Sequence, residues 1–145
     1  MPFQNKILSL CIAVVIAFTA FGCGVKSPRK GNDLLTIRSP EQNFEAVLRE
    51  VDIDGSIMVS QPYEVLIRNL AIDPAEFRVI LSADRTDGLR IRWTEPGLLE
   101  VCYSSARIYG FTNAFVALRR EPALLQKAEI MLRRTKSLAD CPPTT

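Results

Sequence analysis

Apolar and polar residues alternate along most of the chain between residues 34 and 115. The clearest run is residues 89–94 (LRIRWT), in which Leu, Ile and Trp fall on one face of an extended strand and two Arg and a Thr on the other. Runs with the same period occupy residues 63–68, 77–82 and 99–104. A period of two predicts strands that each turn one face toward a core and the other toward solvent.

Turn signals separate these runs at short intervals. Residues 85–88 (RTDG) end in an Asp-Gly pair, and residues 94–97 (TEPG) carry a Pro-Gly pair suited to a type II turn. Short strands joined by tight turns predict an antiparallel meander or sandwich. The spacing leaves no room for helices between the strands, which argues against a doubly wound nucleotide-binding fold.

The segment 121–139 fits two interpretations. Its apolar residues form one stripe of a helix that begins after Pro122, and this stripe favours a helix. Alternatively, residues 128–133 form a last strand that turns Ile130 and Leu132 inward. The predicted fold class is therefore mainly antiparallel β, meander or sandwich, and α+β if 121–139 is helical.

A continuous apolar stretch, residues 7–22 (ILSLCIAVVIAFTAFG), follows the single basic residue Lys6. It is shorter than the roughly 20 residues of a membrane-spanning helix and has the composition of a secretory signal peptide. Small residues at Ala20 and Gly22, with Cys23 directly after them, resemble the lipobox of bacterial lipoproteins. This resemblance implies that diacylglycerol is attached to Cys23, that residues 1–22 are removed, and that the new terminal amine is acylated.

Two positions depart from the lipobox pattern, since the family prefers Leu where this chain has Ala20 and a small residue where it has Phe21. Simple cleavage before an unmodified Cys23 and an uncleaved anchor reaching Val25 are the alternatives. In Gram-negative lipoproteins, an Asp directly after the lipidated Cys favours retention in the inner membrane. This chain has Gly24 at that position, which resembles lipoproteins sorted by default to the outer membrane. The expected location is the cell envelope, facing the periplasm, with the outer membrane favoured over the inner.

The expected organisation has three parts: a signal peptide at 1–22, a lipidated N-terminus and polar tether at 23–33, and one small β-rich domain at 34–145. Within the body, the segments 92–93 (RW), 98–103 (LLEVCY) and 106–109 (ARIY), with Asn113, resemble small bacterial envelope lipoproteins that carry a domain of unknown function. The resemblance covers about residues 34–134 and implies no known activity.

Composition narrows the function classes further. The 145 residues include 18 Lys and Arg, 16 Asp and Glu, and no His. A net charge of +2 without a basic stripe argues against nucleic-acid binding. Without His there is no Ser–His or Cys–His nucleophile pair and no His-containing zinc or haem site. We expect no catalytic residue, metal or cofactor, and a binding or accessory module whose partners are the membrane, through the lipid, and an envelope protein or the cell wall.

The four cysteines divide by position. Cys11 leaves with the signal peptide and Cys23 is assigned to lipid, so Cys102 and Cys141 remain as a pair in an oxidising compartment. We predict that they form a disulfide. The alternatives are inert free thiols, with Cys102 buried, or a reactive thiol, although no activating neighbour is visible next to Cys102 in the sequence.

Several polar sets could carry chemistry, and each also has a simpler interpretation. Asp52, Asp54, Asp84 and Asp87 could supply a carboxylate pair to an enzyme acting on envelope glycans, although Asp is also common in turns. Residues 50–61 follow the spacing of an EF-hand calcium loop but end in Gln61 where that loop needs a bidentate Glu.

The arginines and the aromatic residues could likewise have a functional role or an ordinary structural one. A group of arginines could bind carboxylate or phosphate, or could simply solvate the outer face of a sheet. Tyr109, Phe111 and Phe115 could belong to the core or to an aromatic interaction rim. A purely structural envelope lipoprotein is a further hypothesis. The arginines in question are Arg90, Arg92, Arg107, Arg119 and Arg120.

Overall fold

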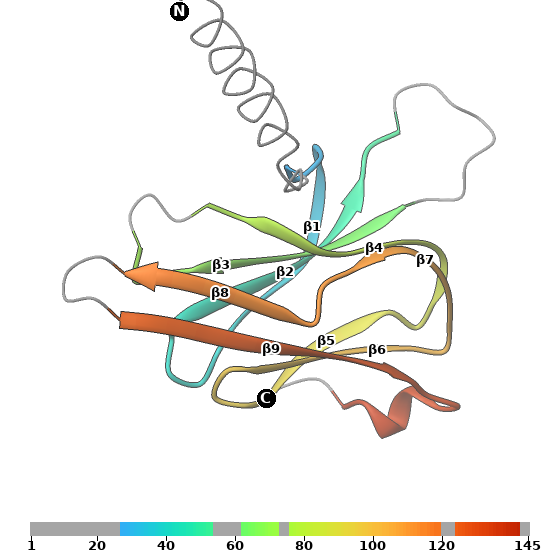
Figure 1. Cartoon of the computed structure of the whole chain (residues 1–145). Helices are drawn as coiled ribbons and strands as arrows, with labels where there is room; N and C mark the ends of the chain where they lie inside the picture. Colours follow the sequence, from blue (N-terminus) through green and yellow to red (C-terminus); the bar gives the residue numbers. More distant parts are fainter. Residues whose placement is uncertain (1–26, 54–61, 73–75, 120–123, 143–145) are drawn as a thin grey trace, which may run out of the picture.

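The computed structural model describes residues 27–53, 62–72, 76–119 and 124–142 (Figure 1). Within these ranges the chain forms nine β-strands and one short 3-10 helix. The strands are β1 Gly31–Arg38, β2 Phe44–Val51, β3 Tyr63–Asn69, β4 Arg78–Asp87, β5 Arg90–Glu95, β6 Leu98–Tyr103, β7 Ser105–Phe111, β8 Ala114–Arg119 and β9 Leu124–Arg134.

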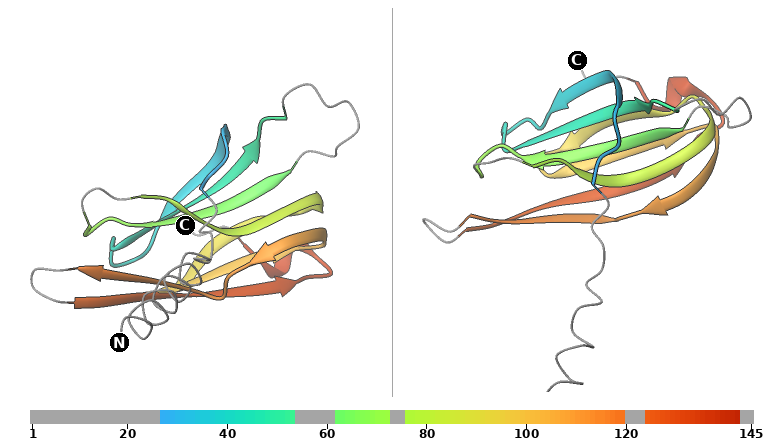
Figure 2. Two further views of the ribbon diagram at one scale, coloured as in Figure 1. Left: turned by 45° about the horizontal axis from the view of Figure 1, so that its top comes forward. Right: turned by 90° about the horizontal axis from the view of Figure 1, so that it is seen from above.

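The strands form two sheets that face each other as the layers of a sandwich (Figure 2). The five-stranded sheet has the order β1-β2-β3-β4-β7, and the four-stranded sheet has the order β5-β6-β9-β8. Every neighbouring pair is antiparallel except β6 and β9, which run parallel. The predicted mainly antiparallel β fold is confirmed, and of the two architectures foreseen it is the sandwich.

The core lies between the sheets and is built from the inward positions of the alternating runs. Trp93 on β5 packs against Phe44 on β2, with ring centroids 6.2 Å apart, and Phe115 on β8 meets Phe44 edge-on at 6.1 Å. Val65 and Leu99 are fully buried. Aromatic contacts between the two sheets thus help to hold them together.

The helix favoured for residues 121–139 is wrong, because most of that segment is the 11-residue strand β9. Ala128 and Ile130 face the core, Leu132 packs against it, and Leu125 and Met131 point outward and stay exposed. Apolar residues on both faces of a strand imitate a helical stripe. Pairing with β6 on one side and β8 on the other decides the conformation, and it is a contact between distant segments.

The first strand begins earlier than the predicted domain. β1 starts at Gly31, so residues 31–33, assigned to the tether by the sequence, belong to the sheet. The Asp33 carboxylate accepts a hydrogen bond from Nε of Arg49 on β2 at 2.5 Å. The sheet therefore begins eight positions after Cys23.

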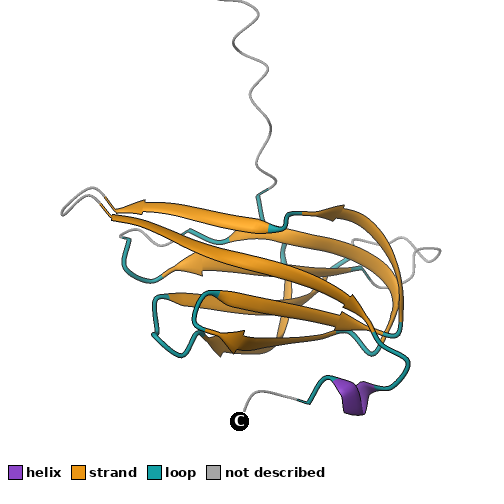
Figure 3. Cartoon of the chain, turned by 60° about the horizontal axis from the view of Figure 1, so that its bottom comes forward, coloured by secondary structure: helices purple, strands orange, loops and turns teal. Residues whose placement is uncertain are grey.

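After β9 the chain crosses the outer face of the four-stranded sheet. The short 3-10 helix, Leu138–Asp140, follows β9 (Figure 3). Cys141 comes directly after it and is buried. No helix in the described ranges is long and apolar enough to cross a membrane.

Candidate functional site

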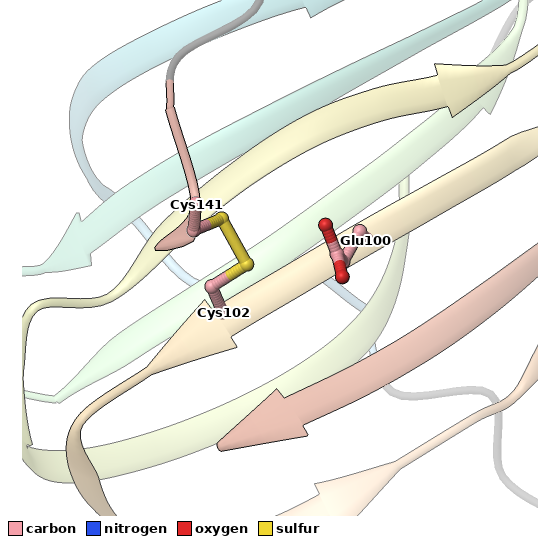
Figure 4. Close-up of side chains that lie close together, drawn as sticks. All are labelled: Glu100, Cys102 and Cys141. Carbon is pink, nitrogen blue, oxygen red and sulfur yellow. A yellow bond between two sulfur atoms is a disulfide. The ribbon is translucent and has the colours of Figure 1, made fainter. Parts of the chain in front are cut away.

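The cysteine pair predicted from the sequence lies at disulfide distance. The sulfurs of Cys102 and Cys141 are 2.05 Å apart and the Cα atoms 6.4 Å apart (Figure 4). Cys102 is on the outward side of β6, and both residues are almost completely buried. The link holds the C-terminal segment against the four-stranded sheet, with Arg133 and Arg90 donating to the backbone oxygens of Asp140 and Cys141.

A buried carboxylate lies beside this disulfide. Glu100, also on the outward side of β6, has a side chain that is only 1% exposed. Nε of Arg92 donates to Oε2 of Glu100 at 2.5 Å, and Nη1 of Arg133 lies 3.0 Å from Oε1. The charge of Glu100 is therefore balanced by arginines from both neighbouring strands, β5 and β9.

A metal site is conceivable beside the disulfide, because donor atoms of Glu100, Cys102 and Cys141 lie within 4.8 Å of one another. The two sulfurs are bonded to each other and offer no thiolate. The remaining ligand, Glu100, is already paired with two cations, which would repel a metal ion. This group does not form a usable donor set in the oxidised protein.

A second buried carboxylate lies on the outer face of the five-stranded sheet. Asp84 on β4 is 1% exposed and receives two hydrogen bonds from Arg107 on β7, from Nε at 2.8 Å and from Nη2 at 2.5 Å. The hydroxyl of Tyr109 donates to the same carboxylate at 2.5 Å. The hydrogen bond to Asp84 raises the pKa of Tyr109, because an ionised phenolate would face a negative charge, and Asp84 likewise raises the pKa of Arg107.

A third buried carboxylate, Glu64 on β3, lies close to the second. It accepts a hydrogen bond from the backbone N of Arg29 at 3.2 Å and another from the side-chain Nε at 2.7 Å. Ser27, Arg29, Glu64, Ser82 and Tyr109 line one depression with a volume of about 450 Å³. The residues just before β1, from Ser27 on, are thus held on the outer face of this sheet by Arg29.

The four aspartates considered for glycan chemistry occupy unlike surroundings. Asp84 is buried and fully engaged in its ion pair, whereas Asp52 and Asp87 are exposed. Asp54 lies outside the described residues, as do residues 54–61 of the calcium-like segment 50–61. Most of that loop is therefore not described. Asp84 already accepts hydrogen bonds from Arg107 and Tyr109.

The five arginines considered as one patch lie on different sheets. Arg90 and Arg92 are on β5 in the four-stranded sheet, and Arg107 is on β7 in the five-stranded sheet. The side chain of Arg119 and all of Arg120 lie outside the described residues. Of the aromatic residues, Phe115 belongs to the core, whereas Tyr109 is 57% and Phe111 39% exposed.

The sequence interpretation missed the buried carboxylates, including Glu45, which pairs with Arg38 and Arg68. Glu64 and Glu100 occupy positions that the predicted alternation assigns to solvent, and Glu45 is on β2, where the sequence analysis named no alternating run. A signal was present, because Arg92 and Glu100 occupy facing positions in a predicted hairpin. What alternation does not reveal is that long Arg stems cover the outward face and bury the acid beneath them.

In comparisons with known proteins, no protein-family model matches the chain, and no curated protein and no solved structure matches it either. The function is therefore inferred from the sequence and from the geometry described above.

Proposed function

We propose that this protein is a lipid-anchored lipoprotein of the cell envelope that acts as a binding or accessory module facing the periplasm. The observation that carries the proposal is the apolar stretch 7–22, which ends in Ala20-Phe21-Gly22 and is followed directly by Cys23. Multiple acyl chains on Cys23 give stable anchoring, which a single chain does not. The favoured location is the outer membrane, because Gly24 follows the cysteine.

Two structural features support this assignment. The Cys102–Cys141 pair lies at disulfide distance, and structural disulfides persist in oxidising compartments such as the bacterial periplasm. The folded domain also begins close behind Cys23, since Arg29 is already bound to Glu64. Both features agree with a short-tethered domain on the periplasmic side of a membrane.

The long β8–β9 hairpin supports the binding role. Val116 is 51%, Leu118 60% and Leu125 65% exposed, and Leu118 and Leu125 are direct cross-strand partners. Exposed apolar side chains gathered on one face mark interaction surfaces. We name Val116, Leu118 and Leu125 the hairpin face and propose it as the contact for an envelope protein.

Metabolic labelling tests the lipid anchor. Cells that express the full chain are grown with a fatty-acid probe, and the purified protein is examined for label. We expect the wild type and Cys11→Ala to carry label, since Cys11 lies within the removed segment, and Cys23→Ala to carry none. Equal label on wild type and Cys23→Ala would overturn the proposal.

Site-specific photo-crosslinking in cells tests the hairpin face. A crosslinker at Leu118 is expected to give one defined protein adduct that Leu125→Ser abolishes, and a crosslinker at the exposed Thr94 on β5 is expected to give none. Recovery of the uncrosslinked protein alone at both positions would contradict a binding role for this face.

A further inference from the structure

On the outer face of the five-stranded sheet, near Arg29, two ion pairs bury their acids and expose their bases. The carboxylates are the buried members, with side chains 3% exposed for Glu64 and 1% for Asp84. Their partners Arg29 and Arg107 lie above them, and each of these side chains is 51% exposed. The acids are therefore shielded from solvent, and the charge presented outward is that of the guanidinium groups.

An exposed aromatic ring completes this surface. Tyr109 is 57% exposed, its hydroxyl is held by Asp84, and the guanidinium of Arg107 lies 5.2 Å from the centre of the ring. We name Arg29, Arg107 and Tyr109 the tether surface. Guanidinium groups recognise phosphate oxygens well, and tyrosine is enriched where membranes meet water.

The length of chain before Ser27 limits where this surface can lie. Only four peptide steps separate Cys23 from Ser27, and at about 3.3–3.6 Å per residue they span at most about 14 Å. Ser27 lines the same depression as Arg29 and Tyr109. An acyl anchor on Cys23 would therefore keep Ser27 within about 14 Å of the membrane. A tether this short lets the neighbouring tether surface approach to the roughly 8 Å over which charges act at physiological salt.

We propose that the tether surface docks the domain onto the phospholipid headgroups of its own membrane, with lipid phosphates on Arg29 and Arg107 and the ring of Tyr109 at the interface. This rests on the proposed lipidation of Cys23. The outer face of the five-stranded sheet then lies against the membrane. The hairpin face, on the four-stranded sheet, is left available to a protein partner.

Fluorescence quenching in reconstituted vesicles tests the orientation. The mature lipidated protein is inserted into vesicles of phosphatidylethanolamine and phosphatidylglycerol that contain a lipid with a quencher on its headgroup. A fluorophore is attached to a new cysteine, either Ser105→Cys on β7 beside Arg107 or Thr94→Cys on the opposite sheet; both positions are exposed. We expect strong quenching at residue 105 and weak quenching at residue 94.

A matched pair of variants tests the chemistry. Arg107→Lys and Arg133→Lys each keep a cation beside a carboxylate that is 1% exposed, but only Arg107 belongs to the tether surface. We expect Arg107→Lys to lower the ratio of docked to undocked domains about fivefold, which corresponds to about 1 kcal/mol. Arg133→Lys should leave the ratio unchanged, and about 1 M NaCl, where the screening length is about 3 Å, should lower it in all variants.

Three outcomes would overturn this inference: equal quenching at residues 105 and 94 in the wild type, equal effects of the two lysine variants, or loss of docking when inorganic phosphate replaces chloride at constant ionic strength. The last result would assign the tether surface to a free phosphate ion. Failure of lipidation is detected separately, because the fatty-acid label would then be absent before reconstitution begins.

Discussion

Glu100 shows how a single acidic residue organises the outer face of the four-stranded sheet. Its side chain is 1% exposed and lies between Arg92 and Arg133, whose side chains are 18% and 39% exposed. Removing one member of a buried ion pair leaves the others without compensation, and this costs more than the pair contributes when intact. The arrangement links β5, β6 and β9 through charge.

Replacing this carboxylate by an amide should destabilise the fold. We expect Glu100→Gln to lower the free energy of unfolding by about 1–3 kcal/mol, since two guanidinium groups lose their counter-charge. Glu129→Gln is the matched control, because Glu129 is on the same sheet, is 63% exposed and pairs with Lys127, which is 52% exposed. An exposed pair of this kind contributes little to stability, because water and salt screen it. Urea unfolding of both variants measures the difference, and equal losses would contradict this role for Glu100.

Tyr109 provides a pH-dependent test at the same scale. Its pKa is raised above the ordinary value of about 10 because its hydroxyl donates to Asp84. A raised pKa in the folded state means that this hydrogen bond stabilises the fold fully below about pH 10. The stabilisation is lost as the pH rises through the higher folded-state pKa.

An absorbance titration of the phenolate checks this expectation. The folded protein should show a titration step above the ordinary tyrosine range, and unfolding in urea should return it to that range. Tyr109→Phe should remove this step and leave the rest of the curve unchanged. Persistence of the step in Tyr109→Phe would show that it belongs to another residue.

At the scale of elements, the turn between β5 and β6 followed directly from the sequence. Gly97 has a φ of +78°, as the Pro-Gly pair at 96–97 predicts for a type II turn. Its carbonyl accepts a hydrogen bond from the backbone N of Glu129 on β9 at 2.7 Å, and an added Cβ would lie 3.2 Å from the oxygen of Lys127. The turn thus helps to position the parallel partner of β6.

A glycine substitution tests this turn. Gly97→Ala should lower the free energy of unfolding by about 1–2 kcal/mol, because an L side chain strains a left-handed backbone. Gly110→Ala on β7 is the control, since its φ is not in that region and an added Cβ meets nothing within 4 Å. It should be neutral or slightly stabilising in thermal unfolding. A similar loss in both variants would refute the interpretation of Gly97.

Strands and turns could be predicted because their signals are local. The alternation at 89–94 placed Ile91 and Trp93 in the core, where both are buried. The strand β9 could not be separated from a helix, because its outward Leu125 and Met131 are apolar and only pairing with β6 and β8 decides the matter. The ion pairs at Asp84 and Glu64 were missed because their partners are 23 and 35 positions away in the sequence. The pairing of β4 with β7 brings Arg107 to Asp84, and the course of the chain before β1 brings Arg29 to Glu64.

On the scale of the whole molecule, the disulfide joins a central strand to the C-terminal segment across 39 positions of sequence. Closing a loop of this length restricts the unfolded chain and stabilises the fold by about 4 kcal/mol. We expect Cys102→Ser combined with Cys141→Ser to lose about that amount in urea unfolding. Thiol titration of the unfolded wild type without reductant should find neither thiol free, and two free thiols there would contradict the bond.

The two proposed contacts, one with the membrane and one with a protein partner, lie on opposite outer faces of the sandwich. The tether surface lies on the five-stranded sheet beside the first described residues, and the hairpin face lies on the four-stranded sheet. In the proposed arrangement, a short connection to the membrane at one face would leave the other face available to a protein partner. The sandwich is thus well suited to a membrane-bound adaptor, provided that its anchor is attached at Cys23.

Intact-mass measurement of the protein purified from cell membranes tests that anchor most directly. We predict a chain that begins at Cys23, with the added mass of diacylglycerol and an amide-linked acyl group, and with Cys102 and Cys141 oxidised. A chain that retains Met1, or one that begins at Cys23 without added mass, would contradict it.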